Sequence, residues 1–152
     1  MAYTTDRRQK HPFLDGMYCL CKDGVGIGWI GVDARIGEGA RIGKGAEIGE
    51  GAEIGEGAWI GVDAEIGEGA RIGEGAEIKS IYDYMTVGGI GSRQAMTTFY
   101  RCKYGLIRVN CGCFNGTLDE FESAVHKTHA GSIHERTYMA AIRMAREIMI
   151  HD

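Results

Sequence analysis

The chain reads WIGVDARIGEGARIGKGAEIGEGA from residue 29 to residue 52, and the same six-residue pattern continues to Ile78. An isoleucine recurs at every sixth position, a glycine follows it from Gly31 to Gly73, and a small residue lies two positions before it. A period of six fits neither a helix, with about 3.6 residues per turn, nor a simple alternating strand. It predicts short flat faces joined by tight corners, with isoleucine inside and glycine where the backbone turns.

The repeat also predicts which of its faces are buried. Three six-residue faces close one coil of eighteen residues, and coils stack at the strand spacing of about 4.8 Å. On the third face, which is the least acidic, the outward side chains include Arg41, Trp59 and Val62. Trp29 begins an identical WIGVDA segment on another face. Exposed tryptophan and valine on a flat sheet indicate a contact, so we expect these four residues to lie at an interface between subunits.

Residues 36–41, IGEGAR, match residue by residue the motif of the hexapeptide-repeat family, which this stretch resembles. The resemblance implies a left-handed parallel β-helix and a homotrimer, and the handedness rests on the resemblance alone. Many members are acyltransferases that use acetyl-CoA or acyl carrier protein with a histidine in the coil, and others resemble γ-class carbonic anhydrases. Residues 29–78 contain no histidine and no inserted loop, so catalysis at the coil is not expected. Orphan proteins of bacteria and their phages look similar.

The expected fold class is mainly β, a left-handed parallel β-helix with a small C-terminal β-hairpin and two helices. We expect an N-terminal arm and cap over residues 1–28, the β-helix over residues 29–95, with its last coil irregular, and an α+β module over residues 96–152. In that module, alternating apolar positions predict a hairpin. Thr117 and Ser132, each followed three positions later by glutamate, predict the starts of two helices.

Composition limits the compartment and the class of protein. The 152 residues carry a formal net charge of −4 and five cysteines, an odd number that favours free thiols in a reducing cytosol. No apolar run reaches the roughly 18 residues of a membrane span, and the first residues lack a signal-peptide core. We therefore expect a cytoplasmic protein.

The segment VGGIGSR, residues 87–93, is the most suggestive loop for ligand binding. Its glycines free backbone N–H groups, Ser92 can donate a hydrogen bond, and the Arg93 guanidinium can grip an anion. Arg101 and Arg108, close to Tyr100, add charge and a ring on which a nucleotide can stack. These five residues are the predicted site for a small anionic ligand. A junction that merely ends the coil is the alternative interpretation.

Cysteine and histidine side chains of the C-terminal module offer two further possibilities, zinc binding or a cysteine nucleophile with a histidine base. The residues concerned are Cys102, Cys111, Cys113, His126, His129 and His134. Zinc sites use closely spaced pairs of ligands, whereas Cys111 and Cys113 alternate with apolar residues in the manner of buried thiols. The sequence therefore predicts neither a metal nor a cofactor, and no spacing brings a cysteine and a histidine together.

These observations predict a non-catalytic homotrimeric scaffold or binding protein that presents C-terminal modules and binds a nucleotide-like anion or a protein partner. The alternative is an acyltransferase of the acetyl-CoA type in which His126, His129 or His134 reaches over the end of the coil. A third hypothesis is a mimic of nucleic acid, because residues 29–78 carry eleven acids and four bases. Direct binding to nucleic acid is not expected.

Overall fold

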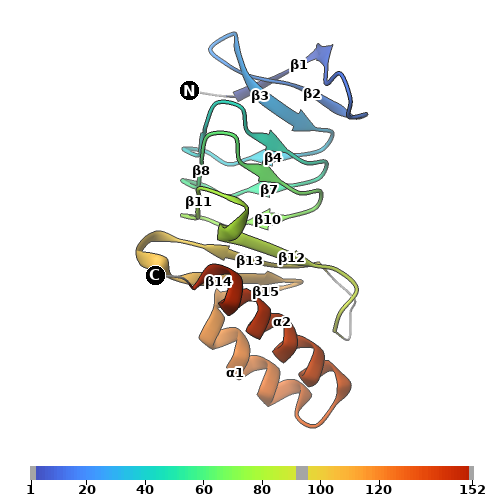
Figure 1. Ribbon diagram of the computed structural model, residues 1–152, viewed down its shortest axis with the longest axis vertical. Helices are drawn as coiled ribbons and strands as arrows, with labels where there is room; N and C mark the ends of the chain where they lie inside the picture. The colour runs from blue at the N-terminus through green and yellow to red at the C-terminus, as the bar shows by residue number, and fades with distance from the viewer. Residues whose placement is uncertain (1–2, 92–95, 151–152) are drawn as a thin grey trace.

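The computed structural model describes residues 3–91 and 96–150. The molecule is elongated, with a strand hairpin at the N-terminal end, short stacked strands in the middle, and a second sheet followed by two helices at the other end (Figure 1).

Three N-terminal strands close one end of the stack. They are β1 (Tyr3–Lys10), β2 (Met17–Lys22) and β3 (Val25–Gly31), and they pair antiparallel in the order β1-β2-β3. Leu20 of β2 is buried against the first coil, and the backbone N–H of Ile42 donates a 2.8 Å hydrogen bond to the Tyr3 hydroxyl. Apolar side chains of the N-terminal strands thus cover isoleucines that the first coil would otherwise expose.

The repeat folds into eight strands of two residues each, which continue the parallel pairing that begins at β3. These strands are β4 (Arg35–Ile36), β5 (Arg41–Ile42), β6 (Glu47–Ile48), β7 (Glu53–Ile54), β8 (Trp59–Ile60), β9 (Glu65–Ile66), β10 (Arg71–Ile72) and β11 (Glu77–Ile78). Parallel pairs join residues eighteen apart, so that Ile30 lies beside Ile48 and Ile48 beside Ile66. We call residues 29–78 the repeat stack. Its centre is a column of buried isoleucine and alanine side chains. Burial of each isoleucine side chain stabilises the folded state by about 1.5–3 kcal/mol.

The expected fold class is wrong. The molecule is not a mainly β chain built on a long left-handed parallel β-helix, but a set of small sheets of mixed pairing with two helices. The parallel faces are only three strands deep, one of them belongs to a sheet whose other strands are antiparallel, and a separate four-stranded sheet is entirely antiparallel. The reason is that the repeat covers only about a third of the chain, and the flanking segments follow an antiparallel pattern of their own.

The four-stranded sheet caps the other end of the repeat stack. After the short 3-10 turn η1 (Ile81–Asp83), its strands are β12 (Tyr84–Val87), β13 (Thr97–Arg101), β14 (Ile107–Cys111) and β15 (Phe114–Thr117). The predicted hairpin is present as β13 and β14. The segment expected to form a last irregular coil instead pairs antiparallel with β13, Tyr84 opposite Tyr100. Arg71 of β10 links the repeat stack to the four-stranded sheet, because its backbone carbonyl accepts a 2.8 Å hydrogen bond from Asn110 of β14.

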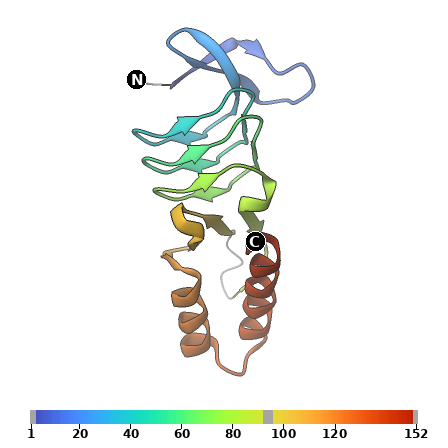
Figure 2. The same cartoon turned by 60° about the vertical axis from the view of Figure 1, so that its left-hand side comes forward.

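Two helices cover the outer face of this sheet (Figure 2). They are α1 (Leu118–His129) and α2 (Ile133–Met149). Thr117 and Glu120 form the predicted capping box at the start of α1. At α2, Ser132 accepts from the Glu135 backbone, but the Glu135 carboxylate accepts from Gly131 rather than from Ser132. Neither helix is long and apolar enough to cross a membrane, among the residues the structure describes.

Candidate functional site

The predicted ligand-binding residues do not form one surface. Ser92 and Arg93 lie outside the described residues. Tyr100 is buried at 1% exposure in the core beneath the repeat stack, and its hydroxyl accepts a 3.3 Å hydrogen bond from Asn115. Its ring is therefore not presented to a ligand in this structure.

The two predicted arginines have different surroundings. Arg101 lies 3.6 Å from the buried Asp83 carboxylate and donates a 3.1 Å hydrogen bond to the Met149 carbonyl. It therefore joins the end of α2 to η1. Arg108, two strands from Tyr84, donates a 2.8 Å hydrogen bond to the Asn115 side chain and also lines a surface groove.

That groove runs between the β5–β8–β11 face of the repeat stack and the η2 turn (Lys103–Gly105) that joins β13 to β14. Its cavity volume is about 620 Å³. We call it the aromatic groove. Its lining comprises Arg41, Gly57, Trp59, Glu74, Gly75, Glu77, Cys102, Lys103, Tyr104, Leu106 and Arg108.

Two exposed aromatic side chains stand at the aromatic groove. Trp59 is 41% exposed, and the Lys79 ammonium lies 5.6 Å from its ring centre. Tyr104 is fully exposed, and its backbone is left-handed at φ 61° and ψ 22°. A bulky residue in this conformation is disfavoured by about 1–3 kcal/mol, and such strain is concentrated at functional sites. The turn thus holds a large ring in solvent at a conformational penalty.

Several hydrogen-bond donors in the aromatic groove lack partners. Within residues 3–91 and 96–150, the side chains of Arg41, Lys103, Trp59 and Tyr104 make no hydrogen bond and no ion pair. Arg108 adds a third cation. Together these groups can bind acceptor-rich anions.

The aromatic groove also contains two carboxylates and a thiol. Glu74 and Glu77 supply two carboxylates against the three cations. The Cys102 thiol is buried, and burial raises its pKa; the nearby Arg108 charge lowers it and Glu77 raises it. Cys102 is therefore neutral, and the charge of the groove comes from its arginine, lysine and glutamate side chains.

The predicted interface residues divide between two places. Val62 is 66% exposed and lies on the corner that follows β8, and Trp59 and Arg41 are on the adjacent strands of the same face. Trp29 lies on the β3–β6–β9 face, half-buried, with its ring centre 4.9 Å from that of His11. The structure contains one subunit, so the interface stays a prediction.

The cysteines and histidines that the sequence analysis considered for zinc or catalysis lie in the four-stranded sheet and its turns and in the two helices. All five cysteines are free thiols. His126 pairs with Glu135 at 2.9 Å, and the rings of His129 and His134 lie 5.6 Å apart. In the described part of the chain, no three His, Cys, Asp or Glu side chains gather as metal ligands would.

Sequence reasoning missed the contribution of the η2 turn. Arg41 and Trp59 were predicted for an interface and Arg108 for a ligand site, yet all three line one groove with Tyr104 and Lys103. One signal was present, because Lys103-Tyr104-Gly105 places a large aromatic residue in a hairpin turn where glycine or asparagine is usual. What no local pattern contains is the approach of this turn to the third face.

Comparisons with known proteins found no match to this chain among family models, curated proteins or solved structures.

Proposed function

We propose that this protein is a non-catalytic binding protein whose aromatic groove takes a small anionic ligand with a planar ring, of the nucleotide class. The observation that carries the proposal is the set of unpartnered donors on Arg41, Lys103, Trp59 and Tyr104 in a single groove with two exposed rings, among the residues that the structure describes.

Each part of such a ligand has a complementary group in the groove. A base can stack on Trp59 or Tyr104, and stacking on one aromatic side chain is worth about 1–3 kcal/mol. The Arg41 guanidinium can hold two phosphate oxygens at once, and the Lys103 ammonium adds a point charge. Glu74 and Glu77 can accept from ring amino groups or sugar hydroxyls. The volume of about 620 Å³ falls within the usual range for small-molecule sites.

Calorimetric titration of the protein with nucleoside monophosphates and diphosphates tests the proposal. We expect binding that Trp59→Ala and Arg41→Gln each weaken at least tenfold, which corresponds to about 1.4 kcal/mol. Val62→Ala is the matched control, because Val62 is an exposed apolar residue just after β8 that does not line the groove. The absence of heat with every nucleotide at millimolar concentration, in protein that is folded by circular dichroism, would overturn the assignment.

The proposal includes self-association into a homotrimer that presents three helical modules. Exposed Trp59 and Val62 on the β5–β8–β11 face support it, since solvent-exposed apolar groups on a flat sheet gain from burial between subunits. Because Trp59 also lines the groove, a neighbouring subunit on this face would lie beside the ligand. A substitution at Val62, which does not line the groove, separates the two roles.

A further inference from the structure

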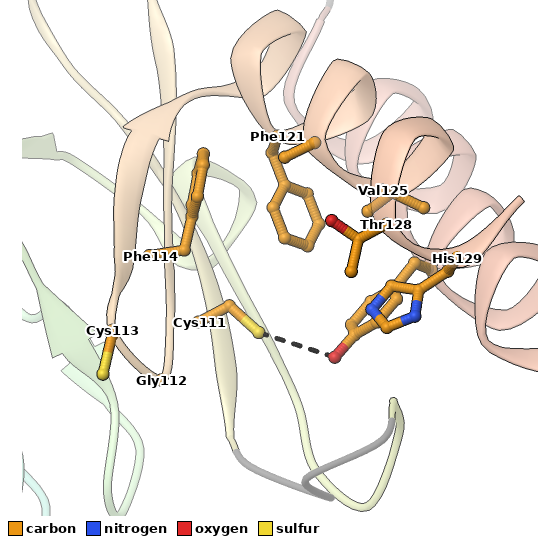
Figure 3. Close-up of a pocket in the computed structure, with 10 residues that line it drawn as sticks. Cys111, Gly112, Cys113, Phe114, Phe121, Val125, Thr128 and His129 are labelled. Carbon is orange, nitrogen blue, oxygen red and sulfur yellow. Dashed lines mark hydrogen bonds between the residues drawn. The ribbon is translucent and has the colours of Figure 1, made fainter.

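A second cavity lies in the helical end of the molecule, between the β14–β15 turn and the two helices (Figure 3). Its volume is about 260 Å³, and it shares no lining residue with the aromatic groove. We call it the thiol pocket, after Cys111 on its wall. Figure 3 shows the Cys111 sulfur turned toward the interior, whereas Cys113 at the other end of the turn points away.

One wall of the thiol pocket is aromatic and aliphatic. The rings of Phe114 and Phe121 lie 5.2 Å apart between centres, and Val125 and the small Ala124 complete the wall from α1. Phe121 and Val125 belong to the closed core of the module. This wall therefore offers a firm apolar surface rather than mobile side chains.

The opposite wall carries polar atoms that are held in place. The Cys111 sulfur accepts a 3.2 Å hydrogen bond from the Thr97 hydroxyl and lies 3.8 Å from the Tyr138 hydroxyl. The Tyr138 ring packs against that of His129 at 5.7 Å between centres. A side chain at Gly91 would collide with the Tyr138 hydroxyl, so the chain passes closely there and confines Tyr138.

The lining contains no Lys, Arg, Asp or Glu side chain among the residues the structure describes. From these described side chains, a charged ligand would lose hydration without gaining a partner ion. A neutral ligand meets an apolar wall on one side and hydroxyl, imidazole and thiol groups on the other. The chemistry of this pocket thus differs from that of the groove, which is rich in unpaired cations.

We infer that the thiol pocket is a second binding site, for a neutral molecule with a single aromatic ring and one hydrogen-bonding substituent, of the phenol type. Size supports this class, because cavities of about 150 Å³ hold an unsubstituted benzene ring, and about 260 Å³ leaves room for a substituent. The ring packs beside Phe114 and Phe121, and its hydroxyl exchanges hydrogen bonds with Thr128 or His129.

Calorimetric titration with phenol, benzoate and benzylamine tests the inference. We expect phenol to bind, and the two charged rings to bind at least tenfold more weakly. Ala124→Leu fills the pocket from α1 with a good helix former, and we expect it to weaken phenol binding at least tenfold. Ala140→Leu is the matched control, because Ala140 is exposed on α2 and does not line the pocket. Phenol binding that survives Ala124→Leu, or no binding at ten millimolar phenol, would refute the site.

A second readout places the ligand beside Cys111. In a Cys113→Ser background, which removes the exposed thiol, we expect saturating phenol to slow iodoacetamide alkylation of Cys111 at least fivefold by intact mass. Unchanged alkylation in the presence of bound phenol would place the phenol elsewhere and contradict the inference. Trp59→Ala should leave both phenol measurements unaltered, so that failure of the nucleotide proposal and failure of this one are distinguishable.

Discussion

Gly57 and Asp63 occupy the same position of successive repeats, at the corner where the backbone is left-handed. Their φ angles are 68° and 59°. Glycine has no steric penalty there, and aspartate tolerates it better than most residues. Gly55, two positions before Gly57, is needed for a different reason, because an added Cβ would collide with the backbone nitrogen of Glu74 in the next coil. One glycine therefore serves the turn and the other the stacking.

Alanine substitutions should separate these two requirements. Gly57→Ala meets no atom within 4 Å, and we expect it to lower the free energy of unfolding by about 1–2 kcal/mol for the left-handed conformation alone. Gly55→Ala must move the next coil and should be more harmful. Urea unfolding followed by circular dichroism measures both, and Gly57→Asp, which repeats the choice made at Asp63, should be milder than Gly57→Ala. Equal losses for the two alanine variants would contradict the distinction.

Tyr104 is held in a conformation that asparagine adopts more readily. We expect Tyr104→Asn to leave the free energy of unfolding unchanged or to raise it by up to about 1 kcal/mol, since the exposed ring makes little contact. Nucleotide binding in the aromatic groove should nevertheless weaken about tenfold, because a stacking surface is lost. Urea unfolding and calorimetry on the same variant measure the two effects. A large loss of stability would show that the ring is structural.

At the scale of elements, three carboxylates stabilise the helical hairpin. Glu122 accepts a 2.8 Å hydrogen bond from Arg146, which joins α1 to α2. Glu135 accepts from His126 and from the Gly131 backbone, and Glu120 accepts from the Thr117 backbone. The hydrogen bond from Arg146 lowers the pKa of Glu122, that from His126 lowers the pKa of Glu135, and that from Thr117 lowers the pKa of Glu120.

Lowered carboxylate pKa values give the hairpin an acid sensitivity of defined sign. The ionised forms are favoured in the folded state, so their contribution is complete above the ordinary pKa of 4.5 and is lost as the pH falls below it. We expect the melting temperature to drop as the pH is lowered through this range, and Glu122→Gln to make the drop shallower. Thermal melts followed at 222 nm measure it, with exposed Glu147→Gln as control. A profile that Glu122→Gln leaves unaltered would argue against the Arg146 link.

The helix starts could be predicted from the sequence, whereas the end of the repeat could not. The capping residues Thr117 and Ser132 lie at the helix starts, because a capping signal is local in sequence. The end of the repeat was misread, since Tyr84 continues the period of six. In the structure Lys79 replaces the glycine, and its backbone N–H donates a 2.9 Å hydrogen bond to Asp83, which turns the chain into η1. A period describes side-chain spacing and not the strand that a segment will pair with.

Local sequence patterns also could not predict which residues meet in the aromatic groove. Arg41, Trp59 and Arg108 were recognisable from charge and exposed aromatic character, but their convergence depends on how the four-stranded sheet sits on the stack. Tyr100 was predicted to stack on a ligand because it lies between arginines on the expected hairpin, yet it packs against the repeat stack and is buried there. Both outcomes follow from contacts between segments distant in sequence.

At the scale of the whole molecule, the exposed β5–β8–β11 face determines the predicted assembly. Native mass spectrometry should give a trimer for the unaltered protein. We expect Val62→Glu and Trp59→Glu to give monomers, because a carboxylate buried between subunits would lack a partner. Glu56→Gln, which is exposed at the corner that follows β7, should keep the trimer. A trimer that persists in both glutamate variants would exclude this face as the interface.

Stack length should be adjustable only in whole units. Removing residues 47–64, one coil, joins equivalent repeat positions and should leave a folded protein with one cooperative thermal transition. Removing residues 47–55, half as many, brings corner residues into the isoleucine column and should abolish that transition. Circular dichroism of the two deletions measures this, and the smaller deletion is expected to be the more damaging. Similar behaviour of both would mean that the stack does not depend on register.

The three-sided stack also sets the distance and the relative orientation between the two ends of the molecule. Each coil sets the separation of the N-terminal hairpin and the helical end in steps of about 4.8 Å, and each single repeat turns one end relative to the other by about a third of a revolution. Repeat number therefore acts like the thread of a screw, in which advance and angle are coupled. Adding repeats one at a time would aim the helical end in three successive directions, and only every third addition would restore its original heading.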